Sequence, residues 1–249
     1  MLSFQPSVKL EKALKKLQAA VVNAASGLGA LSADEAHYLN RCALISNVGA
    51  STRIENALLT DAEVEWVDTT LSVDGRTTAF EQHKDFILDK LSKDRERSVE
   101  EVVGCREVLA TIYAQARDFI PLTEMVIRGL HHDLLKFYPQ ASPYAGGYKT
   151  APNRVISQNH ATGEVRTVLD PAAPGVATET AMADLAAWYN ANRHESPWPL
   201  LAATEFVFRF LAIHPFQDGN GRIGRALFLL ALLQSDDEPL AAVMPYVAL

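Results

Sequence analysis

A helical spacing of apolar residues runs through most of this chain and constrains its fold more than any other feature. Three segments open on the capping pattern S/T-x-x-E, whose two side chains satisfy backbone N–H groups at a helix start. These are Ser32 with Glu35, Thr60 with Glu63, and Ser98 with Glu101. The spacing predicts helices over about 7–27, 33–47, 49–57, 61–70, 78–92, 99–118, 123–137, 178–192, 199–213 and 220–234. We therefore predict an all-α protein with a multi-helix core.

Residues 139–176 interrupt the helical pattern, because prolines and glycines recur there too often for a helix to form. Within this segment the stretches "RVISQ" and "EVRTVL" flank "NHATG". Two β-prone stretches around a turn sequence predict a small β-hairpin, which would form a flap on the helical core.

The segment "HPFQDGNGRIGR", residues 214–225, contains the pattern G-x-G-x-x-G from Gly219 to Gly224. In a dinucleotide-binding fold this pattern follows a buried strand and belongs to a βαβ unit. Here it follows His-Pro-Phe-Gln-Asp, and a proline with polar neighbours does not suit the end of a buried parallel strand. We favour a different kind of phosphate site, in which the glycines form the turn at the start of helix 220–234.

This alternative site has the groups that phosphate chemistry needs. The glycines allow successive N–H groups at the helix N-terminus to point into one concavity, which favours an anion. Arg222 and Arg225 lie three residues apart, so both are expected to reach one polyphosphate. Asp218 offers the hard oxygen that Mg²⁺ prefers, and His214 can accept a proton near neutral pH. The combination indicates phosphoryl or nucleotidyl transfer.

The segment resembles the H-x-F-x-D/E-G-N-G-R-x-x-R motif of the Fic family, matched here by His214, Phe216, Asp218, Gly219, Asn220, Gly221, Arg222 and Arg225. Upstream, "GGYKTAPNRVI" is similar to the glycine-led flap that precedes this motif in the family, with Lys149 at a place where we expect an arginine. The stretches "VATETAMADLAAWYN" and "PLLAATEFVFRFLAIHPF" are similar to the helices between flap and motif.

The resemblance implies a protein adenylyltransferase, which moves AMP from ATP to a Ser, Thr or Tyr hydroxyl of a target protein and releases pyrophosphate. It implies an N-terminal helical region over 1–97, a catalytic core over 98–235 and a C-terminal segment over 236–249. His214 is the expected catalytic base and Asp218 the expected Mg²⁺ ligand. Asn153, Arg154 and Val155 of the flap are expected to align the target as an added strand. The residues expected to bind ATP and Mg²⁺ are Asp218, Gly219, Asn220, Gly221, Arg222, Ile223, Gly224, Arg225 and Glu55.

A second similarity lies in "STRIEN", residues 51–56, which resembles the S/T-x-x-x-E-G/N inhibitory motif found on a helix N-terminal to the core in many Fic proteins. The matching regulatory residues are Ser51, Glu55 and Asn56. Glu55 is then expected to meet Arg225 in a bidentate carboxylate–guanidinium pair at the position of the γ-phosphate. The chain is therefore expected to be autoinhibited.

Two alternatives stay open. The same site suits transfer of UMP, phosphocholine or a terminal phosphate, and a nucleotide-binding regulatory module without catalysis belongs to a different class. The sequence does not identify the target protein, and the chain itself is one candidate. A homo-oligomer is also compatible with the sequence. His131, His132 and Asp133 are adjacent on a helix, so their side chains diverge, and we interpret them as structural or surface groups rather than a metal site.

Charge, hydropathy and cysteine usage limit the cellular location and the kinds of binding partner that we expect. The net charge of −7 does not favour nucleic acid or an anionic membrane as a partner. No stretch approaches the ~18 consecutive apolar residues of a membrane-spanning helix. Cys42 and Cys105 have no pairing or metal spacing, which is typical of a reducing compartment. We therefore expect a cytoplasmic protein.

Overall fold

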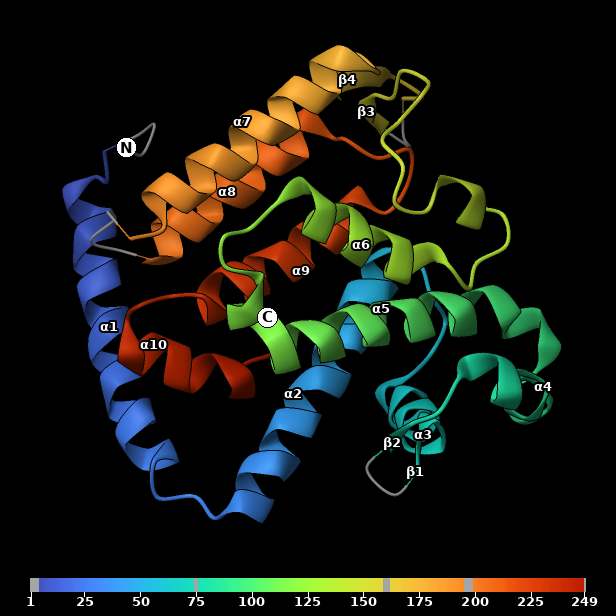
Figure 1. Ribbon diagram of the computed structural model, residues 1–249, viewed down its shortest axis with the longest axis horizontal. Helices are drawn as coiled ribbons and strands as arrows, with labels where there is room; N and C mark the ends of the chain where they lie inside the picture. Colours follow the sequence, from blue (N-terminus) through green and yellow to red (C-terminus); the bar gives the residue numbers. More distant parts are fainter. Residues whose placement is uncertain (1–4, 74–75, 159–161, 195–198, 249) are drawn as a thin grey trace.

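The computed structural model describes residues 5–73, 76–158, 162–194 and 199–248. These residues form ten α-helices and two short β-hairpins (Figure 1). The helices are α1 (Val8–Leu28), α2 (Ala33–Ile54), α3 (Asp61–Leu71), α4 (Phe80–Leu91), α5 (Glu96–Gln115), α6 (Glu124–Leu135), α7 (Val176–Asn192), α8 (Pro199–Ile213), α9 (Asn220–Leu233) and α10 (Glu238–Val243). The predicted all-α class is confirmed.

Two of the three predicted capping boxes are confirmed. The side chains of Ser32 and Thr60 each accept the N–H three residues on, and the glutamates at those positions return the bond. The third is wrong, because α5 already begins at Glu96 and Ser98 lies inside it. The Ser98 hydroxyl instead accepts the backbone N–H of Leu58, and Glu101 is buried beside the site described below.

One long helix, α2, replaces the two helices predicted over 33–47 and 49–57. A glycine within a helix weakens it by about 1 kcal/mol without ending it. Gly49 also leaves room for a contact, since a Cβ there would lie 2.4 Å from Asp61 Oδ1 and 2.7 Å from Arg53 Nη1, two atoms that form an ion pair over the helix. The continuous helix carries Ser51 to the centre of the molecule.

Helix α5 lies at the centre of the fold, in contact with α2, α6 and α9 (Figure 1). Its apolar residues belong to a single core that extends from Ile45 to Met244, and Ile112 is fully buried in it. The backbones of α5 and α6 approach so closely that a Cβ on Gly104 would lie 2.1 Å from the Leu134 carbonyl oxygen. Helices α5 and α6 are therefore in direct backbone contact, and α9 packs against both of them.

The predicted flap is present as an antiparallel hairpin of β3 (Val155–Gln158) and β4 (Val165–Leu169). It lies near the N-terminal end of α7 and the C-terminal end of α8 (Figure 1). The centre of the predicted turn, residues 159–161, lies outside the described residues.

Two elements were not predicted. A second small hairpin pairs β1 (Ser72–Val73) with β2 (Arg76–Thr77). Helix α10 is capped by the Asp237 side chain and packs against α1. Within the residues that the structure describes, no helix is long and apolar enough to cross a membrane.

Candidate active site

The motif residues 214–219 form a loop between α8 and α9, and two of them have left-handed backbones. Gly219 has φ 78° and is the N-cap of α9, and His214 has φ 51°. A side chain at Gly219 would be strained, and its Cβ would lie 3.1 Å from Leu134 Cδ2. Since the first intrahelical bond of α9 runs from the Ile223 N–H to the Gly219 carbonyl, the N–H groups just before Ile223 are left for a ligand.

Asn220 holds the loop in shape and does not direct its side chain at a ligand. Its side chain is buried, accepts the Phe216 N–H at 2.9 Å and donates to the Phe216 carbonyl at 2.7 Å. Only its backbone N–H can serve the anion site. Ile223, also expected to bind nucleotide, is fully buried in the core, and Gly224 packs against Leu211. These two residues therefore support α9 from within.

His131 supports the same loop from α6, which confirms its structural interpretation. It is fully buried and stacks on Phe216, with ring centroids 3.7 Å apart. Gly146 donates its N–H to His131 Nδ1, so Nε2 carries the proton and donates to the Asp218 carbonyl at 3.0 Å. Burial lowers the pKa of His131 to about 4, which keeps this ring neutral. The sequence signalled no such role, although Leu130 and His131 both lie on the buried face of α6.

The imidazole of His214 is half-buried at the end of α8. Burial lowers the pKa of His214 below its usual value; a hydrogen bond to the backbone of Leu211 opposes this shift, and the positive charge of Lys149 adds to it. A lowered pKa favours the neutral imidazole, in which one ring nitrogen can accept a proton. This is the protonation state that a general base requires.

Arg222 and Asp218 lie together at the start of α9. The Arg222 side chain is 3% exposed; Nη2 lies 3.3 Å from Asp218 Oδ1, and Nη1 lies 3.8 Å from Glu101 Oε1. Its Nε and Nη1 are buried without a hydrogen-bond partner among the described residues. Buried guanidinium N–H groups without acceptors are costly unless an anion completes them.

Asp218 is the exposed member of this group, with 48% of its side chain accessible. The described residues contain no cluster of three or more His, Cys, Asp or Glu side chains suited to a metal. One exposed carboxylate next to an anion site fits Mg²⁺ well, since that ion is commonly held by one or two carboxylates together with phosphate oxygens and water.

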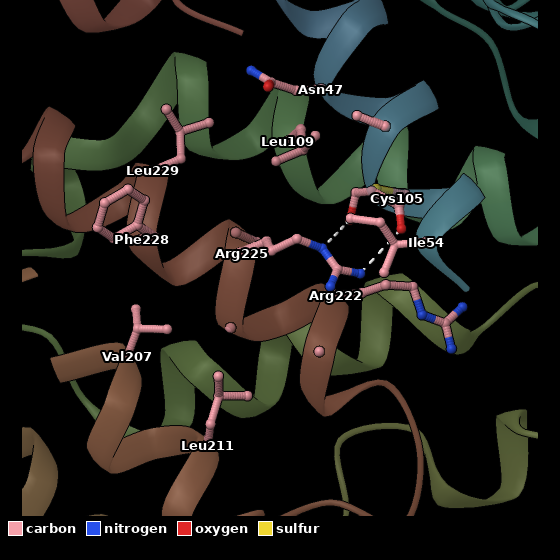
Figure 2. A pocket seen from close by; sticks show the side chains of 15 residues that line it. Asn47, Ile54, Cys105, Leu109, Val207, Leu211, Arg222, Arg225, Phe228 and Leu229 are labelled. Carbon is pink, nitrogen blue, oxygen red and sulfur yellow. Dashed lines mark hydrogen bonds between the residues drawn. The ribbon is translucent and has the colours of Figure 1, made fainter. Parts of the chain in front are cut away.

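The side chain of Arg225 extends toward α2 (Figure 2). Its Nε donates to Ser51 Oγ at 2.9 Å, and its Nη2 donates to the Ser51 carbonyl at 3.0 Å and to Glu55 Oε1 at 2.8 Å. The predicted contact between the two motifs is present, but the predicted bidentate pair is wrong. Glu55 takes one N–H of Nη2, while Ser51 takes the other N–H of Nη2 and that of Nε. A Cβ on Gly221 would lie 2.8 Å from Glu55 Oε1, so the carboxylate also lies against the glycine turn.

The left-handed backbone of Asn56 ends helix α2 within the inhibitory motif. Helix α2 stops at Ile54 with Glu55 as C-cap, and Asn56 is left-handed with φ 70°. The N–H of Asn56 donates to the Arg53 carbonyl, and that of Ala57 donates to the Thr52 carbonyl. This is the Schellman arrangement, which requires glycine or asparagine at the left-handed position. A carboxylate at the negative end of a helix is unfavourable unless a cation compensates it, as Arg225 does here.

An apolar hollow of about 410 Å³ lies beside Arg225, between α2, α5, α8 and α9 (Figure 2). The charged residues among its lining are Arg222 and Arg225. Its walls are Asn47, Ala50, Ser51, Ile54, Cys105, Leu109, Val207, Leu211, Gly221, Gly224, Ala226, Phe228 and Leu229.

Of the three flap residues expected to align a target, Arg154 lies at the surface, whereas Asn153 turns inward. Val155 opens strand β3, and Arg154 lies at the surface within 3.4 Å of Asp170. Asn153 instead turns its side chain inward, to the loop that carries His214. Its expected role in target docking is therefore not supported by its side-chain contacts.

The fold and this loop define a helical domain that places a neutral histidine, a carboxylate and a helix N-terminus around one anion site. Residues 121–232 match the model of the Fic/DOC family. Together with the motif and the solved structures below, this match identifies the segment as a Fic/DOC-family domain.

Several solved structures are similar to this chain over nearly its whole length. A Fic-domain-containing signalling protein from Bacteroides thetaiotaomicron has 26% identity and a TM-score of 0.65, with 89% of this chain and 72% of that chain covered. A Fic family protein from Desulfovibrio desulfuricans has 24% identity and a TM-score of 0.62. The match covers 98% of this chain and 63% of that chain. Fic-1 from C. elegans has 18% identity and a TM-score of 0.62, with 90% and 58% covered. The last two likenesses bear on the fold alone.

Proposed function

We propose that this protein transfers AMP from ATP to a hydroxyl side chain of a target protein and releases pyrophosphate. Fic/DOC-family members commonly transfer AMP or similar groups onto proteins. The observation that carries the proposal is the arrangement around Arg222, a buried guanidinium with unpaired N–H groups at a helix N-terminus. Such a group calls for a bound anion, and a phosphate chain supplies one.

In this scheme each residue has a defined task. His214 takes the proton of the attacking hydroxyl, which forms a bond to the α-phosphorus while the bond to the β-phosphate oxygen breaks. The N–H groups at the start of α9 and the Arg222 guanidinium stabilise the charge that develops on the α-phosphate. Arg225, once free, holds the terminal phosphate.

Mg²⁺ would bind through Asp218 and phosphate oxygens, and it would neutralise part of the charge of the departing pyrophosphate. Arg154 and the β3 strand at the flap would align the target segment.

The Ser51–Glu55–Arg225 contact supports an autoinhibited resting state. Glu55 occupies a donor that the terminal phosphate needs and places a negative charge where that phosphate belongs. Two like charges at one site disfavour productive binding of ATP. The carboxylate does not touch His214 or Arg222 in the described contacts, so the groups proposed for the chemistry stay in place while the nucleotide position is blocked.

The proposal is tested with ATP labelled at either the α- or the γ-phosphate. The full chain carrying Glu55→Gly is incubated with Mg²⁺, labelled ATP and a mixture of candidate proteins, and label on protein is measured after electrophoresis. We expect the α-label and not the γ-label on protein, and neither in Glu55→Gly with His214→Ala. Transfer of the γ-label would make the protein a phosphotransferase. Binding of ATP without transfer to any protein, the chain itself included, would favour the regulatory module.

Target proteins with a modifiable hydroxyl, including this chain, are the proposed partners, with no nucleic acid and no membrane required. A cytoplasmic location and a homo-oligomer also remain proposals.

A further inference from the structure

Four consecutive backbone carbonyls, from Ile213 to Phe216, accept hydrogen bonds from Lys149 and Asn153, and the last of them also accepts one from Asn220. Lys149 Nζ donates to the Ile213 carbonyl at 3.1 Å, and its backbone N–H donates to the Pro215 carbonyl at 2.8 Å. Asn153 Nδ2 donates to the carbonyls of His214 at 3.3 Å and Phe216 at 2.9 Å. Lys149 Nζ also donates to Asn153 Oδ1 at 2.9 Å, which joins the two residues. We call this pair the carbonyl clamp.

The clamp acts on a strained part of the chain. His214 has φ 51°, a left-handed conformation that non-glycine residues rarely adopt and that persists only where surrounding contacts fix it. This backbone conformation sets the direction of the Cα–Cβ bond from which the imidazole extends. Without the clamp, the residue could relax to a common conformation and the ring would turn away from the anion site.

Burying the ammonium group of Lys149 at this position costs free energy that packing alone does not explain. It is 2% exposed, and no described carboxylate lies within ion-pair distance of it. Burial of an ammonium group among neutral acceptors is costly, and an apolar side chain would fill the same space more cheaply. Consistent with this cost, burial lowers the pKa of Lys149. Of the charged groups in the described residues, Lys149 is the one that acts on the imidazole of His214.

We propose that Lys149 and Asn153 are positioning residues, which hold the His214 backbone in its left-handed conformation and keep the imidazole directed at the anion site. The inference rests on the proposed function, in which His214 is the base. It assigns Asn153 to the support of the catalytic loop, because its amide nitrogen donates to two carbonyls of that loop and its amide oxygen accepts from Lys149. Alignment of the target is left to the neighbouring flap residues.

Four full-length variants test the clamp in the Glu55→Gly background. Lys149→Met removes the ammonium and keeps the backbone bond to Pro215, Lys149→Arg retains a cation, and Asn153→Ala removes the bridging amide. Lys136→Met is the matched control, since Lys136 is a partly buried lysine whose partners, Glu107 and Asp133, lie outside the site.

We expect Lys149→Met and Asn153→Ala to lower kcat by about 10- to 100-fold with the KM for ATP changed by less than about threefold. Lys149→Arg should recover kcat to within about threefold of the parent, and Lys136→Met should match the parent. In Lys149→Met the acid limb of the pH–rate profile should also move to higher pH, because loss of the nearby cation favours the imidazolium. Parent-like kcat in both clamp variants, or a loss confined to KM, would overturn the proposal.

A second measurement does not depend on transfer activity. In protein labelled with ¹³C-histidine, the His214 signal is assigned by its loss in His214→Ala and titrated by NMR. We expect a higher His214 pKa in Lys149→Met and faster exchange of the backbone amides of Ile213, His214 and Phe216 in both clamp variants. An unchanged titration together with unchanged exchange would refute the clamp whether or not AMP transfer is found. If Lys149→Met does not fold, Asn153→Ala and Lys149→Arg carry the same test.

Discussion

The contact between Glu55 and Arg225 makes a quantitative prediction about the resting activity. Arg225 Nη2 lies 2.8 Å from Glu55 Oε1, so a phosphate bound to the same guanidinium would lie within about 4 Å of the carboxylate. At that distance two unit charges of one sign repel by about 4 kcal/mol when the effective dielectric constant is about 20. The Arg225 and Glu55 side chains are 34% and 36% exposed, so screening reduces the penalty to about 1.4–2.8 kcal/mol. We therefore expect Glu55→Gly to raise AMP transfer by about 10- to 100-fold.

The assay is turnover at saturating ATP and Mg²⁺, with the parent, Glu55→Gly and Glu55→Gln compared side by side. Glu55→Gln keeps the shape and removes the charge, so it should show most of the gain if charge is the cause. Glu65→Gln, on an exposed face of α3, is the matched control and should leave turnover unchanged. Adding Arg225→Ala to Glu55→Gly should abolish the gain. Turnover in Glu55→Gly equal to or below that of the parent would refute the reasoning.

Three further predictions follow from the same geometry. His214→Ala should lower transfer by about 10²–10⁴-fold and leave ATP affinity, measured by calorimetry, within about twofold of the parent; unchanged turnover would remove His214 from the mechanism. Burial and the charge of Lys149 lower the pKa of His214, so the base stays neutral to a lower pH than an ordinary histidine does. We therefore expect kcat/KM to stay constant as the pH falls through 6.5 and to drop only at lower pH. A midpoint of the acid limb above pH 6.5 would contradict this. Asn220→Ala leaves the buried N–H of Phe216 unpaired and should cost about 1–3 kcal/mol in urea unfolding; an unchanged midpoint would show that the side chain does not hold the loop.

Most of the fold could be predicted from the sequence, because helix periodicity and capping are local. Ser32 and Thr60 cap their helices as their patterns indicate. Ser98 shows the limit of this reasoning. The same pattern occurs there, but tertiary packing extends α5 upstream and uses its hydroxyl for Leu58. A four-residue pattern cannot reveal which partner, 40 residues away in the sequence, competes for a side chain.

The sequence predicts the residues proposed to bind the nucleotide, but it does not predict the residues that hold them in place. The motif indicated His214, Asp218 and Arg225, since these residue types are chemically specific. Glu101 and His131 act across α5 and α6, and their partners are set by how the helices pack. Lys149 stood out as a departure from the flap pattern, but its position beside Ile213 and Pro215 depends on the path of the loop. Tertiary contacts of this kind leave no periodic signal in a single sequence.

Intact-mass spectrometry tests the central claim most directly. Glu55→Gly and Glu55→Gly with His214→Ala are each incubated with ATP, Mg²⁺ and candidate target proteins, and every protein is then weighed and its modified residue mapped by tandem fragmentation. The account predicts a mass increase of one adenylyl group on a Ser, Thr or Tyr side chain with the first variant, and none with the second. A mass increase of one phosphate, an adenylyl group that persists without His214, or unmodified proteins throughout would contradict it.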